Sequence, residues 1–412
     1  MRAAAPNSTA RQALWLVAFM WGAYFLNYTD RQAVFAMFPA LELDLQMSDQ
    51  QLGLTGSIFL WTYGICCPLA GQLADKFSKR LLIILSLAIW SLVTVATGLA
   101  TSAFMLLALR AMMGVSESLY MPAAIAMTAN AYAPEKRSRA VATLMTAQVA
   151  GVVGGAWFGG WMAHHGHWRT AFFVLGTVGL LYAIPYCLFL LTVHEDAQVE
   201  TRKAKPRWAL AELARVPTFC VLCVVFPAFV FGLWMLLSWL PSFFHDKFSL
   251  DMATAGFTAT AYLQGATVVG LLSGGLLADK FFLITRASRL WLMTASLLLC
   301  APCLHAIGNS ESLTATCCAA AAYGLFSGFF MGNIFPAAFE VVPADTRATA
   351  VGLLNFFGAV VSGFAPLVGG VWRKTIGLER LLSLTSLLYI VAAVVLIICI
   401  KLLFPSDYAR TH

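Results

Sequence analysis

The chain alternates between long apolar runs and short polar breaks. Each run is close to the roughly 20 residues that a helix needs to cross the hydrocarbon core of a bilayer. The pattern therefore predicts twelve membrane-spanning helices. Their approximate limits are 14–38, 52–72, 81–100, 103–128, 140–163, 170–192, 217–243, 253–277, 289–308, 312–338, 348–371 and 380–403.

One polar break is much longer than the others. It covers residues 193–216, VHEDAQVETRKAKPRWALAELARV, and separates six apolar runs from six more. We therefore expect three parts. They are an N-terminal six-helix half at 1–192, a cytoplasmic linker at 193–216 and a C-terminal six-helix half at 217–412.

The composition agrees with a membrane protein. The 412 residues are 60% hydrophobic and 11% charged, whereas soluble domains have roughly 25% charged residues. Two Cys-x-x-Cys pairs, at 220–223 and 300–303, lie in apolar runs without a nearby His or Cys cluster, which favours helix packing over metal binding. We expect an all-α membrane protein without metal or cofactor.

Basic residues are distributed unevenly between the two sets of loops. If both termini are cytoplasmic, nineteen Lys and Arg residues lie inside, five lie outside, and Arg31 and Arg110 lie within spans. Cytoplasmic loops of membrane proteins are enriched in Lys and Arg. The bias predicts a multi-pass plasma membrane protein, of the bacterial inner membrane, with cytoplasmic termini. It also explains the net charge of +7 without nucleic acid.

Three motifs recur 204 to 210 residues later at corresponding spans. The pairs are GQLADKFSKR at 71–80 and GLLADKF at 275–281, RSRAVATL at 137–144 and RATAVGLL at 347–354, and the glycine pairs 159–160 and 369–370. Repeats in register predict two parallel, pseudo-symmetric halves. Transporters built from parallel repeats hold their site near the midplane, where the halves meet.

Four charged residues lie deep within the predicted spans: Asp30 and Arg31 in the first, Arg110 and Glu117 in the fourth. A charge at the bilayer centre costs roughly 2.5–3.5 kcal/mol on insertion scales. Two carboxylates and two guanidiniums can offset this cost by neutralising one another. Arg110 and Glu117 share a helix face, whereas Asp30 and Arg31 point to adjacent sectors. One of that pair can thus face the fourth span and the other the central cavity.

This cluster has no counterpart in the second half, since Ser327 stands 210 residues after Glu117. A purely structural salt-bridge network is one interpretation. The asymmetry favours another, a proton-coupling site. Burial favours a neutral carboxyl group, and a neighbouring guanidinium favours the charged form. A site that exchanges its Arg partner for a substrate would therefore take up and release protons. Because Arg stays charged and matches carboxylate geometry, the expected substrate is an organic anion.

The repeated loop motif resembles that of the major facilitator superfamily, G-x-L-A-D-R/K-x-G-R/K-R/K, although Ser78 replaces its second Gly. The resemblance covers the whole chain and implies the major facilitator fold. It implies a transporter and not an enzyme. It also implies that the motif gates a rocking motion between two access states, whereas a short turn that only sets topology is the alternative. The gating residues would be Gly71, Asp75, Lys76, Arg80 and Asp279.

Several short sequence motifs are similar to those of the anion:cation symporter branch of that family. This branch includes bacterial sugar-acid carriers and vesicular glutamate and sialic acid transporters. NYTDR at 27–31 resembles its N-Y-x-D-R, and RAMMGVSESLYMPA at 110–123 resembles its R-x6-E-x4-P-A. The resemblance implies proton symport driven by the proton gradient. Asp30, Glu117 and Arg110 would couple protons. The substrate would be bound by Arg31, Tyr28, Tyr63, Gln148 and Asn355, and Asn333 is a further polar candidate. Ordinary interhelical hydrogen bonding is the alternative role for the uncharged residues.

Other functions remain open from the sequence. Spinster-like lipid transporters also have an N-Y-x-D-R first helix and an acidic residue in the fourth, and the Phe-rich second half would suit an amphipathic substrate. A membrane-bound enzyme or receptor would need a site such as the His cluster at 164–167, which lacks further metal-ligand partners. The expected partners are a small organic anion, protons and the lipid bilayer, and the protein is expected to be a monomer.

Overall fold

The computed structural model describes residues 10–132, 134–193, 206–343 and 346–411, and in these ranges every regular element is a helix. Part of the predicted linker, 194–205, lies outside the described residues. Helices satisfy all backbone polar groups within one segment, which a bilayer core requires. Contacts divide the chain into two compact units, unit 1 (1–47, 58–202 and 251–257) and unit 2 (48–57, 203–250 and 258–412).

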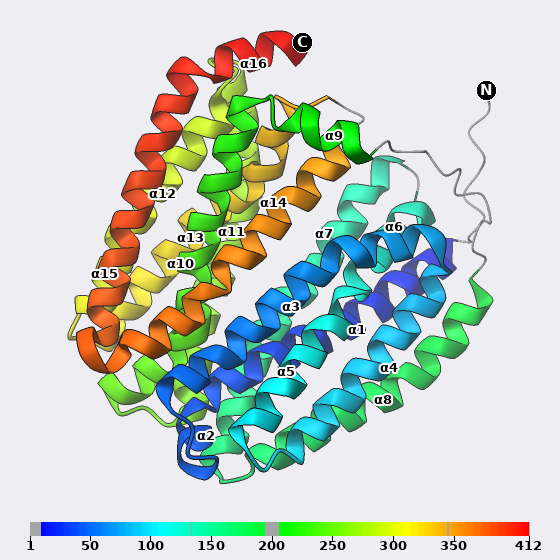
Figure 1. Cartoon of the computed structure of the whole chain (residues 1–412), viewed down its shortest axis with the longest axis vertical. Coiled ribbons are helices and arrows are strands. Elements are labelled where there is room, and N and C mark those ends of the chain that lie inside the picture. The colour runs from blue at the N-terminus through cyan, green and yellow to red at the C-terminus, as the bar shows by residue number, and fades with distance from the viewer. Residues whose placement is uncertain (1–9, 133, 194–205, 344–345, 412) are drawn as a thin grey trace. The chain divides into compact units, whose positions relative to one another are not determined.

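The helices up to residue 192 lie mainly in unit 1 (Figure 1). They are α1 (Ala10–Ala36), α2 (Phe38–Asp44), α3 (Asp49–Lys76), α4 (Lys79–Gly98), α5 (Ala103–Ser118), α6 (Tyr120–Ala131), α7 (Pro134–His164) and α8 (Trp168–Thr192).

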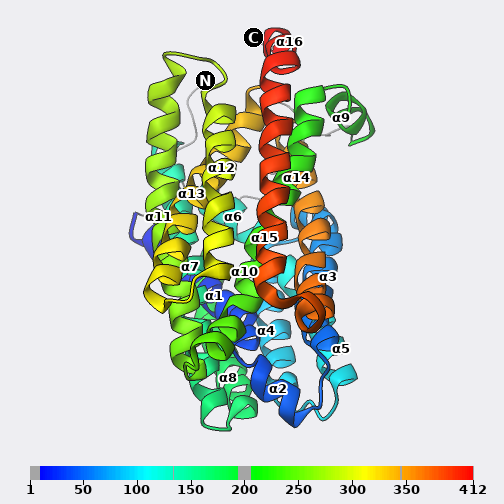
Figure 2. The same ribbon diagram turned by 90° about the vertical axis from the view of Figure 1, so that its left-hand side faces the viewer.

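The remaining helices lie mainly in unit 2, where α12 packs along α13 and α15 (Figure 2). They are α9 (Pro206–Leu213), α10 (Pro217–Phe248), α11 (Met252–Phe282), α12 (Ser288–Asn309), α13 (Leu313–Phe339), α14 (Arg347–Ser362), α15 (Phe364–Leu402) and α16 (Phe404–Thr411).

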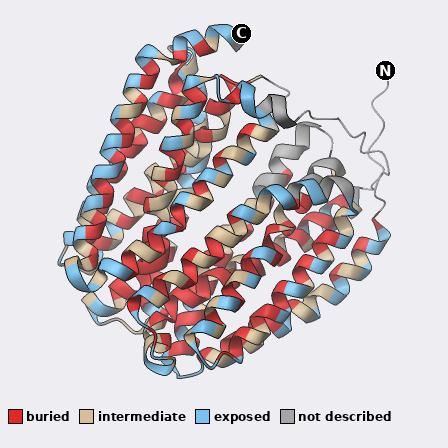
Figure 3. Cartoon of the chain, viewed as in Figure 1, coloured by how far each residue is buried: buried red, intermediate tan, exposed pale blue. Residues whose placement is uncertain are grey.

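The twelve predicted spans all fall on these helices, and the all-α membrane fold is confirmed. Nine stretches of the described chain are long and apolar enough to cross a membrane, and one of them, Thr349–Leu402, contains two predicted spans. Buried residues face the interior of each helix bundle, and exposed ones face outward (Figure 3). On α8 the outward residues Leu181, Ile184, Leu188 and Leu191 form an apolar stripe, as expected of a surface that contacts lipid.

Two predicted spans are each divided between two helices, and the span 348–371 is divided into α14 and α15 at Gly363. The span 103–128 is divided into α5 and α6 at Leu119, because a proline ring clashes with the carbonyl four residues earlier, and Pro122 follows Ser118 by four. Within α15, Gly377 has φ +80° and ψ 152°, a conformation that glycine adopts without strain. The helix axis therefore breaks there, between the last two predicted spans.

A row of small residues brings α7 against α1. Gly151, Gly155 and Gly159 are spaced by four and therefore lie on one face of α7. A methyl group built on Gly155 would lie 2.5 Å from the carbonyl oxygen and 2.8 Å from the Cα atom of Thr29. This close approach fixes α1 just before its two charged residues, Asp30 and Arg31.

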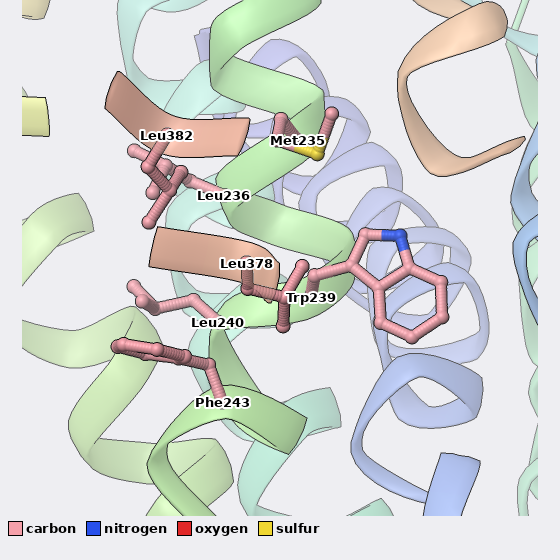
Figure 4. A pocket seen from close by; sticks show the side chains of 7 residues that line it. All are labelled: Met235, Leu236, Trp239, Leu240, Phe243, Leu378 and Leu382. Carbon is pink, nitrogen blue, oxygen red and sulfur yellow. The ribbon is translucent and has the colours of Figure 1, made fainter. Parts of the chain in front are cut away.

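Unit 2 contains a small cavity between α10 and α15 (Figure 4). Its volume is about 10 Å³, and its lining is apolar apart from the Trp239 indole N–H, which donates to the Pro366 carbonyl at 2.9 Å. Ligand sites for small molecules are typically about 300–1,000 Å³. We interpret this cavity as a packing defect.

We predict that Gly155→Ala lowers the thermal unfolding temperature of the detergent-purified protein, because overpacking costs roughly 1–3 kcal/mol. Gly154→Ala is the matched control, since its added methyl group would make only an ordinary contact of 3.5 Å with the Phe25 ring. Equal unfolding temperatures for the two variants would contradict the close packing of α1 on α7.

Candidate functional site

The four buried charges gather in unit 1, and one pair forms a direct ion pair. Arg31 of α1 donates from Nε to Oε2 of Glu117 on α5 at 2.5 Å. The two side chains are 5% and 0% exposed. Glu117 belongs to the last turn of α5, next to the break before α6. The break thus places the carboxylate where Arg31 can reach it.

Asp30 has a different environment. Its Oδ2 atom lies 3.1 Å from the Thr94 hydroxyl on α4, and its Oδ1 atom has no hydrogen-bond partner among the described residues. The same hydroxyl lies 2.9 Å from the Trp90 carbonyl oxygen. A threonine hydroxyl has a single hydrogen to donate. Thr94 either shares this hydrogen between the two oxygens, or donates it to Trp90 and accepts a hydrogen bond from a protonated Asp30.

Arg110 is fully buried, and the expected direct pair with a carboxylate is not seen. Its Nη1 atom lies 3.4 Å from the Met113 sulfur, while its Nε and Nη2 atoms have no partner in the described part of the chain. The Arg110 guanidinium interacts electrostatically with the carboxyl groups of Glu117 and Asp30. Glu117 pairs instead with Arg31 from another helix, and its Oε1 atom also has no hydrogen-bond partner among the described residues.

Three aromatic rings surround the Arg31 guanidinium. Its central carbon lies 4.7 Å from the ring centroid of Tyr28, 4.8 Å from that of Phe59 and 4.6 Å from that of Tyr63. Cation–π contacts within about 6 Å of a ring stabilise a guanidinium, more so when it is desolvated. Tyr28 and Tyr63 are partly exposed, whereas Phe59 is buried. The site therefore has one wall that is not fully buried.

Polar residues without charge complete this region of unit 1. Tyr24 donates from its hydroxyl to Gln148 Oε1 at 3.2 Å, so the predicted substrate residue Gln148 also joins α1 to α7. Asn27 is buried and interacts with Glu117, yet neither of its amide atoms makes a hydrogen bond within the described residues. The sequence analysis included Asn27 only as part of the NYTDR motif, and it did not single out Phe59 or Thr94.

The two predicted asparagines lie in unit 2. Asn333 is buried on α13 and donates to the carbonyl oxygens of Phe329 at 2.8 Å and Gly274 at 3.3 Å. It therefore ties α13 to α11. Asn355 is exposed on α14.

The predicted gating residues are only partly described. The side chains of Gly71, Asp75 and Lys76 lie outside the described set. Arg80 donates to the Val193 carbonyl at 2.9 Å and so caps the end of α8.

In the second copy of the motif, Arg289 bridges Asp279, at 3.0 Å, and Glu340. Burial raises the pKa of Glu340, although the Arg289 guanidinium opposes that shift. This network joins the ends of three helices of unit 2, namely α11, α12 and α13.

The described residues contain no group of three or more His, Cys, Asp or Glu side chains placed to hold a metal ion. All ten cysteines are free thiols.

Comparison with known proteins identifies the class. The family model described as Major Facilitator Superfamily matches residues 20–366 and 231–411. These matches cover most of the chain, which therefore belongs to the major facilitator superfamily.

Individual relatives support the same class. The chain is 30% identical over 379 residues to a protein named probable sulfoacetate transporter SauU of Cupriavidus necator, with 84% of each chain covered. It is 25% identical over 376 residues to the hexuronate transporter of Bacillus subtilis, with 88% of each covered. The predicted resemblance to anion:cation symporters is confirmed, and the protein is a multi-pass membrane transporter and not an enzyme.

A solved structure shares the fold. It is the crystal structure of a bacterial homologue of the human lysosomal transporter Spinster in an inward-facing and occupied conformation. The TM-score is 0.81 at 22% identity, with 97% of this chain and 99% of that chain covered. The match confirms the major facilitator fold.

We predict that two substitutions in this site change stability by very different amounts. Glu117→Ala should cost roughly 3–5 kcal/mol, because it leaves Arg31 buried without its counter-ion. Asp30→Asn should change stability by less than about 1 kcal/mol, since its amide can donate to Thr94 as a protonated carboxyl group does. Thermal unfolding of the purified variants measures both. A loss in Asp30→Asn as large as in Glu117→Ala would contradict a protonated Asp30.

Proposed function

We propose that the protein is a proton-coupled symporter of an organic anion that works by alternating access. The observation that carries this proposal is the charge balance of the site in unit 1. With Asp30 protonated, the cluster has two guanidiniums and one carboxylate, and so one net positive charge in a buried place. A buried uncompensated charge is costly, and an excess of positive charge favours an anion as the ligand.

Arg31 is the proposed anion-binding residue. Its Nε atom is bound to Glu117, while its Nη2 atom is buried without a partner among the described residues. Planar, bidentate binding of a carboxylate or similar oxyanion is what a guanidinium does best. The proposed ligand is therefore an acid, in keeping with the names of the sulfoacetate and hexuronate relatives.

Competition for Arg31 supplies the proposed coupling. When the anion binds the guanidinium, Glu117 loses its counter-ion in a low-dielectric site and takes up a proton. When the anion leaves, Glu117 returns to Arg31 and releases that proton. Asp30 would exchange its proton in another part of the cycle, and Arg110 would favour release from both carboxyl groups by its charge.

The remaining assignments follow the same proposal. Tyr28, Tyr63 and Gln148 would contact the anion, Asn355 stays a predicted contact, and Asn333 would position α13. The motif residues Gly71, Asp75, Lys76, Arg80 and Asp279 would gate the two access states. We place the protein in the bacterial inner membrane as a monomer with cytoplasmic termini.

In proteoliposomes, we predict that an inward proton gradient accelerates uptake of a transported sugar acid or sulfonate. Glu117→Gln should abolish gradient-driven accumulation but retain counterflow exchange, because the glutamine cannot carry a proton. Glu311→Gln, the same change at an exposed position, is the control and should accumulate substrate normally. Normal accumulation by Glu117→Gln would refute the coupling assignment.

We also predict that Arg31→Lys weakens anion binding roughly tenfold or more, because lysine keeps the charge but lacks the donor fork. A thermal-shift screen of sugar acids, sulfonates, aromatic acids and lysolipids would detect ligands of the wild-type protein by their stabilisation. Calorimetry would then compare affinities. Stabilisation by lysolipids alone would favour lipid transport, the alternative function, over anion symport.

A further inference from the structure

A groove on unit 2 has no role in the proposed transport cycle. It has a volume of about 410 Å³ and lies between the last turns of α12 and the part of α15 that follows Gly377. His305, Arg380, Ser383 and two leucines are among the residues that line it. Its volume is within the range of about 300–1,000 Å³ that is typical of small-molecule sites.

The groove lies at the end of an apolar stripe on α15. The exposed residues of this stripe are Leu384, Leu387, Val391, Val394, Ile398 and Leu402. Eighteen residues of helix are about 27 Å long, close to the hydrocarbon thickness of roughly 30 Å. The stripe therefore faces the acyl chains of the bilayer, and its first two leucines are also walls of the groove.

Arg380 lies one helical turn before Leu384, on the same face of α15. That position is just beyond the apolar stripe, where the phospholipid headgroups begin. The side chain is exposed, and it has no ion pair or hydrogen bond with another described residue. A guanidinium in this position is available to bind a phosphate with two parallel hydrogen bonds.

A second donor is oriented beside it. Ser383 uses its single hydroxyl hydrogen on the Glu379 carbonyl, at 3.0 Å. Its oxygen therefore accepts from Asn309, at 3.1 Å, and from Nδ1 of His305, also at 3.1 Å. Nδ1 of His305 also lies 3.4 Å from the Asn309 side-chain nitrogen, and its Nε2 atom has no hydrogen-bond partner among the described residues. A hydrogen on Nε2 makes this atom a second donor for an oxyanion.

We propose that this groove binds an anionic phospholipid of the surrounding bilayer. The phosphate lies against Arg380 and His305, and the upper part of one acyl chain packs along Leu384 and Leu387. Charge complementarity and the continuity of the groove with the lipid-facing stripe identify this occupant. The site is separate from the charged cluster of unit 1, so its failure or success does not affect the proposed transport function.

Native mass spectrometry of the detergent-purified full-length protein tests the proposal with phosphatidylglycerol and phosphatidylcholine as probes. The wild type should retain one phosphatidylglycerol in preference to phosphatidylcholine. Arg380→Ala should bind phosphatidylglycerol about tenfold more weakly, the effect expected for a charge-assisted hydrogen bond. His305→Ala should also weaken binding, which provides a second, independent variant.

Lys401→Ala is the matched control, because it removes one exposed positive charge near the other end of α15. It should bind phosphatidylglycerol as the wild type does. Lipid-free unfolding temperatures equal to that of the wild type would show that the variants are folded. Equal binding by wild type and Arg380→Ala, equal retention of both lipids, or displacement by soluble glycerol phosphate would overturn the proposal.

Discussion

The buried ion pair between Arg31 and Glu117 is the interaction on which the candidate site depends. An unpaired charge in the interior of unit 1 would be strongly destabilising, so each residue of the pair compensates the charge of the other. The pair joins α1 to α5, two helices far apart in the sequence. Asp30 and Arg110 lie around it without direct ion pairs of their own among the described residues. The cluster is thus held together by the Arg31–Glu117 ion pair, and Asp30 and Arg110 make only weaker contacts. An anion that binds Arg31 can therefore alter this arrangement.

Helix packing supplies the geometry of that pair. Small residues of α7 let α1 approach closely just before Asp30, and the break caused by Pro122 ends α5 one residue after Glu117. Aromatic rings from α1 and α3 then restrict the guanidinium. A charged cluster of unit 2 lies near helix ends, where Arg373 and Lys374 pair with Asp49 and Arg373 also pairs with Asp246. Asn333 makes only backbone hydrogen bonds. The two halves share a fold but differ in chemistry, which is why we place proton coupling in the first.

The twelve spans and the family could be predicted from the sequence, because long apolar runs and a repeated loop motif are strong signals. The four charges were also evident, since charge within a span is rare. Their pairing was not, because sequence shows which face of a helix a residue occupies and not which helix that face meets. Thr94 and Phe59 have ordinary roles in most helices and carry no signal of their own. Thr94 illustrates this, since its bond to the Trp90 carbonyl is a common helical contact, and only the nearby Asp30 gives it significance.

Infrared difference spectroscopy on adding a bound anion tests the exchange at Arg31 most directly. A protonated carboxyl group absorbs separately from a carboxylate, so proton uptake by one side chain is visible. We predict that anion binding produces a new carboxylic-acid band that is absent in Glu117→Gln and retained in Glu311→Gln. A spectrum in which a bound anion produces no such band, or in which the band persists in Glu117→Gln, would contradict the exchange of Glu117 for substrate.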